Sequence, residues 1–154
     1  MDLILWRHAE AHEPAEGQED EDRPLTAKGE RQAQRMAKWL NQQMPASARV
    51  LASPARRAQQ TAAALDRKIK TVPALATDGS VEGLLHAVRW PDAREPVLVV
   101  GHQPTLGLVA AYLLAGQPQA WTVRKGAVWW LRGRERDGEE VQVVLHAVVS
   151  PELV

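Results

Sequence analysis

Arginine and histidine residues follow three separate apolar runs of this sequence. In chain order they are Arg7, His8, Arg56, Arg57 and His102. A guanidinium group holds phosphate oxygens in a fork and stays charged at neutral pH. A neutral histidine can attack phosphorus, and nearby cations favour this neutral form because they lower its pKa. These residue types predict phosphoryl transfer, provided that the fold brings them together.

Short, continuous apolar runs predict four buried strands that could position these side chains. The runs cover residues 2–6, 49–53, 71–75 and 96–102, of which the third is the weakest. Residues 123–133 and 141–149 predict two more strands, antiparallel to each other, around a charged turn that contains Asp137 and Gly138.

Apolar residues at spacings of three and four predict helices between these strands. The helices cover residues 26–43, a segment that begins at Ser53-Pro54, residues 80–90 and a segment that begins at Pro104. Thr26 and Ser53 are the expected N-caps of the first two, and Pro91 is expected to end the third. The order of elements predicts an α/β fold of three layers, α/β/α, with a mostly parallel sheet and an antiparallel edge. Chemistry in such sheets gathers at the carboxyl ends of the strands.

Length and composition predict one globular domain over residues 1–154, with 45% hydrophobic and 25% charged residues. Lysine and arginine total 19, as do aspartate and glutamate, which argues against a nucleic-acid or membrane partner. The chain has no cysteine, so a disulfide framework and a thiolate metal site are excluded. No signal-peptide pattern and no apolar run of about 18 residues is present, which predicts a cytoplasmic location.

Four segments resemble, in the same order, the signatures of the histidine phosphatase superfamily, also called the phosphoglycerate mutase-like or RHG family. They are WRHAEA at 6–11, DRPLTAKGERQA at 22–33, ASPARRAQQTA at 52–62 and VVGHQP at 99–104. The likeness is greatest to the small bacterial phosphohistidine phosphatases. Four ordered matches are a far more specific signal than a single Arg-His pair. The resemblance implies a phosphoglycerate mutase-like fold and a hydrolase that needs no cofactor.

The same resemblance implies a role for each matched residue. His8 would become transiently phosphorylated, and Arg7 beside it would bind phosphate. Arg57 aligns with the phosphate-binding arginine of the family, whereas Arg56 occupies a variable position. His102 matches the second histidine, which stabilises the phosphoryl group during transfer by hydrogen bonding.

An acidic segment, residues 13–22, separates the first two signatures and is expected to be a solvated loop. Asp20 or Asp22 of this segment could supply a general acid, although a solvated face is the simpler reading. Arg23, at its end, is an additional candidate for contact with phosphate or substrate.

The sequence departs from the family pattern at two places. Ala9 replaces the glycine that follows Arg-His, which is tolerated unless the backbone there needs a positive φ. Ala74 stands where related small phosphatases are expected to have an acid, so Asp78 and Glu82 are the nearby candidates. The general acid therefore stays unassigned and could be absent.

Together these features predict a phosphatase that acts through a phosphohistidine intermediate on phosphohistidine in another protein. An imidazole, whose conjugate acid has a pKa of about 6.5, leaves without a dedicated acid, whereas an alkoxide needs one. The short chain has little to spare for a lid, so an open pocket is expected. The alternatives are a small-molecule phosphomonoesterase or mutase of the same superfamily and a non-catalytic phosphoprotein-binding module. No metal is expected, because His8 and His12 follow a strand and do not lie on one helix face.

Overall fold

One mixed sheet connects most of the chain in the computed structural model, which describes residues 1–135 and 138–154. Its six strands lie in the order β3-β2-β4-β1-β5-β6. They are β1 (Asp2–Arg7), β2 (Arg49–Ala52), β3 (Ile69–Thr71), β4 (Val97–Gly101), β5 (Val128–Arg134) and β6 (Gln142–Val149). The first four run parallel, and β5 and β6 add an antiparallel edge. The predicted sheet is confirmed, although Asp137 of the expected turn lies outside the described residues.

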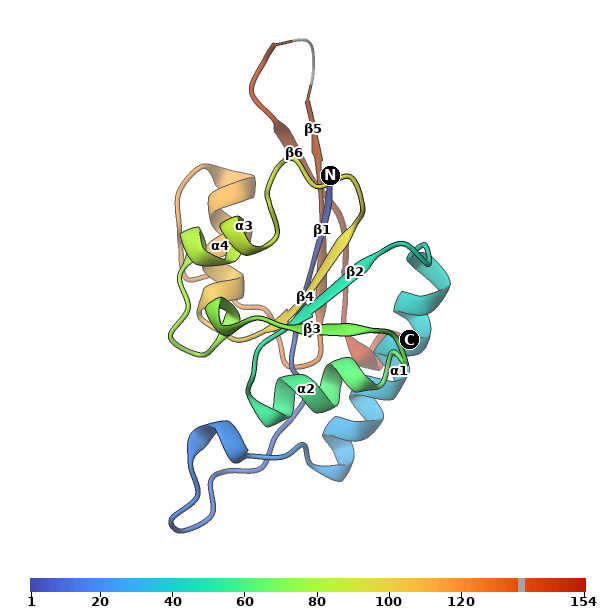
Figure 1. Ribbon diagram of the computed structural model, residues 1–154. Coiled ribbons are helices and arrows are strands. Elements are labelled where there is room, and N and C mark those ends of the chain that lie inside the picture. Colours follow the sequence, from blue (N-terminus) through green and yellow to red (C-terminus); the bar gives the residue numbers. More distant parts are fainter. Residues whose placement is uncertain (136–137) are drawn as a thin grey trace.

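Helices cover both faces of this sheet, as Figure 1 shows. The helices are α1 (Ala27–Gln43), α2 (Arg56–Ala63), α3 (Val81–Ala87) and α4 (Thr105–Ala115). Three short 3-10 turns are η1 (Asp20–Asp22), η2 (Pro73–Leu75) and η3 (Pro151–Leu153). Helices α3 and α4 lie on one face, and α1 and α2 lie on the other. The predicted α/β/α layering is therefore confirmed.

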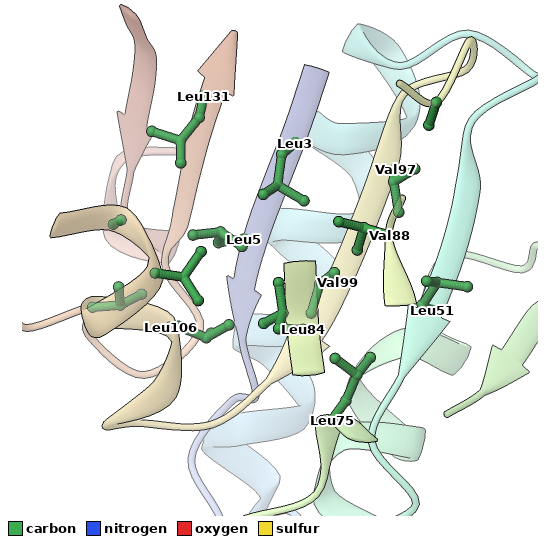
Figure 2. Packing of buried hydrophobic residues seen from close by; sticks show 14 of the residues in the cluster. Leu3, Leu5, Leu51, Leu75, Leu84, Val88, Val97, Val99, Leu106 and Leu131 are labelled. Atoms are coloured by element: carbon green, nitrogen blue, oxygen red, sulfur yellow. The ribbon is translucent and has the colours of Figure 1, made fainter. Parts of the chain in front are cut away.

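Side chains of β1 alternate between the two apolar layers, as expected of a strand buried on both faces. Leu3 and Leu5 pack with Leu84 of α3 and Leu106 of α4, as Figure 2 shows. The alternate residues Ile4 and Trp6 pack on the opposite face, among residues of α1 and α2. Each fully buried leucine contributes roughly 2 kcal/mol through its removal from water. This two-sided core fixes the end of β1, where Arg7 and His8 emerge.

The first helix forms as the sequence predicts, whereas the second begins later. Thr26 caps α1, because its side-chain oxygen accepts a hydrogen bond from the Gly29 nitrogen. The prediction that Ser53 caps α2 is wrong, since α2 begins at Arg56 and its N-cap is Ala55. The Ser53 hydroxyl instead accepts a hydrogen bond from the Ala55 nitrogen and also bonds to His102. A distant partner thus overrides the local capping preference of serine.

Two other predicted boundaries differ from the structure. The third strand covers Ile69–Thr71 and not 71–75 as predicted, because Pro73 has no N–H to pair and starts η2 instead. Helix α3 ends at Ala87, before the expected stop at Pro91, and Arg89 then adopts a left-handed φ of 57°.

Strand β5 begins at Val128, later than predicted, because residues 123–127 form a turn next to the site. Within the described part of the chain, no helix has the length and apolar character needed to cross a bilayer.

Candidate active site

The carboxyl ends of three neighbouring strands place the predicted residues together. His8 follows β1, Ser53 follows β2 and His102 follows β4, which lies between the other two strands. All five predicted site residues line one cavity of about 260 Å³, and they are Arg7, His8, Arg23, Arg57 and His102. This volume lies just below the range typical of sites for whole small molecules. The cavity therefore suits a phosphoryl group together with part of the molecule that carries it.

His8 is held in one tautomer by its own neighbour. Its Nδ1 lies 2.8 Å from the carbonyl oxygen of Ala9. Because a carbonyl oxygen can only accept, Nδ1 carries the proton and Nε2 keeps a lone pair. Ala9 is not among the residues with positive φ, so the replacement of glycine at this position is accommodated. The Ala9 nitrogen donates to Oγ1 of Thr61 at 3.1 Å, which ties this segment to α2.

The imidazole of His8 is buried, with 7% of the residue exposed. Burial lowers its pKa to about 3, and the charges of His102, Arg57 and Arg7 act in the same direction. The hydrogen bond to the Ala9 carbonyl opposes this shift. His8 is therefore unprotonated at neutral pH, the form required of a nucleophile.

His102 packs beside His8, with ring centroids 5.1 Å apart. Its Nε2 lies 2.7 Å from Oγ of Ser53, and its Nδ1 has no hydrogen-bond partner within residues 1–135 and 138–154. Burial lowers the pKa of His102 to about 4, assisted by the charge of Arg57 and opposed by Asp20. The contact with Ser53 was missed by sequence reasoning, although Ser53 lies within a recognised motif.

A turn at residues 123–127, before β5, holds Arg7 through hydrogen bonds. Its Nη1 donates to the carbonyl oxygen of Val123 at 2.9 Å. The nitrogen of Gly126, a residue with φ of +74°, lies 3.1 Å from the carbonyl oxygens of both Arg7 and His8. This turn also brings the exposed Lys125 to the cavity wall. The sequence reading placed these residues in a strand and so missed both contributions.

Arg57 is the arginine of the adjacent pair that enters the site. It is 2% exposed, whereas Arg56 is exposed and does not line the cavity. Its Nη1 donates to the backbone oxygen of Asp20 at 2.8 Å, and its Nη2 donates to Oδ2 of Asp20 at 3.0 Å. The other carboxylate oxygen of Asp20 accepts from Nε of Arg23 at 2.9 Å. Both arginines are thus bound by one aspartate.

The structure brings none of the four candidate acids to the cavity wall in the part of the chain that it describes. Asp78, Glu82 and Asp22 are exposed and do not line the cavity. Although burial raises the pKa of Asp20, hydrogen bonds and charges from Arg57 and Arg23 lower it overall, which disfavours proton donation. Glu13 is the carboxylate among the described lining residues, and sequence reasoning did not single it out from the acidic segment.

The acidic segment flanks the cavity and does not close over it. It contributes Glu13 to the wall, with Arg23 at its end, and residues 14–22 are not part of the lining. Its side chains are largely exposed, as predicted for a solvated loop. Across residues 1–135 and 138–154, no three histidine, cysteine, aspartate or glutamate side chains gather closely enough to hold a metal ion.

Comparisons with known proteins agree with the family and the fold. The profile of the histidine phosphatase superfamily (branch 1) matches residues 3–84. An uncharacterized protein of Picosynechococcus is 39% identical over 126 residues, which cover 76% of this chain and 75% of that relative. The phosphohistidine phosphatase SixA of Escherichia coli is 33% identical over 126 residues, with 76% of each chain covered.

A solved structure extends the likeness to nearly the whole chain. The protein histidine phosphatase SixA in complex with tungstate superposes with a TM-score of 0.75 at 28% identity, and 99% of each chain is covered. Fold and sequence together define a hydrolase of the phosphatase class. The chain belongs to the histidine phosphatase superfamily. Within this superfamily it is similar to the SixA phosphohistidine phosphatases. The predicted family, fold and enzyme class are confirmed.

Proposed function

We propose that the protein removes phosphoryl groups from phosphohistidine in another protein, with His8 as the nucleophile. One domain over residues 1–154 would carry this activity. The observation that carries the proposal is the state of His8, which is buried, unprotonated and fixed with the Nε2 lone pair available in a cationic cavity. The remaining lining residues then have defined tasks.

In the first step, Nε2 of His8 attacks phosphorus while the bond from phosphorus to the substrate nitrogen breaks. Arg7 and Arg57 bind the phosphoryl oxygens and offset their negative charge. The Ser53 hydroxyl accepts from Ala55 and can donate its own proton to Nε2 of His102. That arrangement leaves the proton of His102 on the unpartnered Nδ1, where it can donate to the phosphoryl group.

In the second step, water attacks the phosphorus of phosphorylated His8 and the bond from phosphorus to Nε2 breaks. His8 leaves as the neutral ring, because Nδ1 kept its proton throughout. Both hydrogens of the water depart with the phosphate, which releases one of them to solvent at neutral pH. Neither step requires His8 to gain or lose a proton.

Two features of the cavity favour phosphohistidine as the substrate class. A substrate imidazole whose other nitrogen is protonated leaves as a neutral ring, so it needs no proton from the four candidate acids, none of which lines the cavity in the described part of the chain. The acidic segment flanks the cavity without closing it, so a side chain on a large partner can enter. The similarity to SixA supports this substrate, and tungstate in the related structure is a tetrahedral oxyanion like phosphate.

A comparison of three substrates tests the proposal. The protein is incubated with a phosphohistidine peptide, with p-nitrophenyl phosphate and with a simple alkyl phosphate, and released phosphate is measured. We expect hydrolysis of the first two and far slower hydrolysis of the third, whose alkoxide needs a proton. Brief reaction with labelled substrate should leave an acid-labile phosphoryl group on the native protein and none on His8→Ala. Equal rates with the alkyl phosphate would contradict the substrate class, and labelling of His8→Ala would contradict the nucleophile.

A further inference from the structure

Asp20 stands out because a single side chain contacts two of the cationic groups of the site. Its Oδ2 accepts from Nη2 of Arg57 at 3.0 Å, and its Oδ1 accepts from Nε of Arg23 at 2.9 Å. Its backbone oxygen accepts from Nη1 of Arg57 at 2.8 Å. The aspartate comes from η1 and Arg57 from α2, 37 residues later in the chain.

The contacts of Asp20 leave Arg57 able to bind a further anion. A guanidinium group has five N–H donors, and Asp20 accepts from two of them. Nε of Arg57 is buried and has no hydrogen-bond partner among the described residues. One side of the guanidinium is thus fixed by the protein, while donors remain for phosphoryl oxygens.

Arg57 also needs a partner for its charge. Its side chain is 3% exposed, whereas the Asp20 side chain is 55% exposed. A buried cation without a counter-charge is costly, and a free guanidinium would sample several orientations. The η1 turn has no buried residue, and its hydrogen bonds to Arg57 and Arg23 join it to the site.

We propose that Asp20 is a positioning residue that holds Arg57 and Arg23 in the orientation in which they bind the substrate phosphoryl group. This inference rests on the proposed function, because it assigns both arginines to the phosphoryl group. Asp20 itself does not touch the reacting atoms. It acts by removing the rotational freedom of the two guanidinium groups before the substrate arrives.

Charge alone and positioning predict opposite effects on phosphate binding when the Asp20 side chain is removed. An experiment can therefore distinguish them. If Asp20 only competed with phosphate for Arg57, its removal would tighten phosphate binding. If Asp20 positions the arginines, its removal weakens phosphate binding despite the gain of net positive charge. Glu21, the next residue, is exposed and its side chain makes no hydrogen bond in the described structure, so it provides a matched control.

The experiment measures the dissociation constant of inorganic phosphate by titration calorimetry for the native protein, Asp20→Asn, Asp20→Ala, Glu21→Gln and Glu21→Ala. We expect weakening by about tenfold in Asp20→Ala and by a smaller factor in Asp20→Asn, which keeps one acceptor oxygen. The Glu21 variants should match the native protein. In nitrogen-15 spectra, the Nε–H signal of Arg57 should be sharp in the native protein and broadened in Asp20→Ala.

The outcomes separate this inference from the proposed function. Unchanged or tighter phosphate binding in Asp20→Ala would overturn the positioning role, as would an equal loss in Glu21→Ala. Thermal unfolding of each variant identifies any that fail to fold. If Asp20→Ala does not fold, phosphate binding by Asp20→Asn alone tests the positioning role. A native protein that neither binds phosphate nor hydrolyses any of the three substrates would instead contradict the proposed function.

Discussion

The inner wall of the cavity and its rim are built in different ways. The inner wall is formed by His8 and His102, with Ser53 bonded to His102 behind it. All three residues are buried and follow the ends of parallel strands. The rim consists of Glu13 and Lys125, which are exposed and belong to loops. Strand ends are fixed by two apolar layers, whereas neither loop residue belongs to those layers.

This contrast separates two tasks of the site. Groups that attack or stabilise phosphorus need fixed positions and shifted pKa values, which burial provides. Groups that contact the rest of a substrate can differ in position, because they lie on loops. Arg57 belongs to both regions, because it is buried but is bound by Asp20 from the loop. Variants of residues from the inner wall outward test this division.

Replacement of His8 should have the largest effect. His8→Asn keeps a side chain of similar size but removes the proposed nucleophile, and we expect loss of phosphatase activity by a factor of about 10³ or more. The control is His12→Asn, an exposed histidine that does not line the cavity. Steady-state hydrolysis of a phosphohistidine peptide measures both, and comparable activity in the two variants would refute the role of the inner wall.

Arg57→Lys should have the next largest effect. Lysine keeps the charge but cannot offer the planar fork, nor can it bond both Asp20 and a phosphoryl group in the same way. We expect kcat/KM to fall by about 10²-fold, the usual cost of one lost transition-state donor. Arg56→Lys is the adjacent control and should change kcat/KM little. If the two lysine variants behaved alike, the assignment of Arg57 over Arg56 would be wrong.

Sequence reasoning placed His8 and His102 well because they lie in motifs at the ends of apolar runs. His8 and His102 needed only the rule that strand ends share one edge of a parallel sheet. Ser53 was misread as a helix cap, since its partner His102 lies 49 residues away. Asp20 was read as solvated or as an acid for the same reason, since its partner Arg57 follows only in α2. Local patterns predict elements, whereas side-chain partners depend on the tertiary fold.

Ser53→Ala should have a moderate effect on activity. Loss of the hydroxyl leaves Nε2 of His102 without its partner at 2.7 Å and frees the choice of tautomer. We expect kcat to fall by roughly tenfold, and nitrogen-15 spectra of the His102 ring should show a changed tautomer. Ser80→Ala is the control, because Ser80 caps α3 and its loss should lower stability without changing kcat. A native tautomer in Ser53→Ala would contradict this role.

The last comparison concerns stability in acid, where the buried histidines and Asp20 should behave differently. The pKa values of His8 and His102 are lowered to about 3 and about 4 in the folded protein, so the unfolded chain takes up these protons first as the pH falls below 6.5. The contribution of these two residues to the free energy of unfolding is therefore complete above pH 6.5 and declines as the pH falls toward 4. Between pH 7 and pH 5, each histidine should lower the free energy of unfolding by about 2 kcal/mol.

Asp20, in the loop beside the cavity, should contribute nothing over that range. The pKa of Asp20 lies below its usual value of 3.8, so Asp20 stays ionised in both folded and unfolded protein at pH 5. Its contribution is lost only in stronger acid. Urea unfolding at pH 7 and pH 5 measures the difference, and we expect the loss to be about half as large in His8→Asn, because one of two buried imidazoles is gone. Asp20→Asn should retain the full loss. A pH dependence reduced by Asp20→Asn but not by His8→Asn would mean that the loop, and not the buried histidine pair, couples this fold to protons.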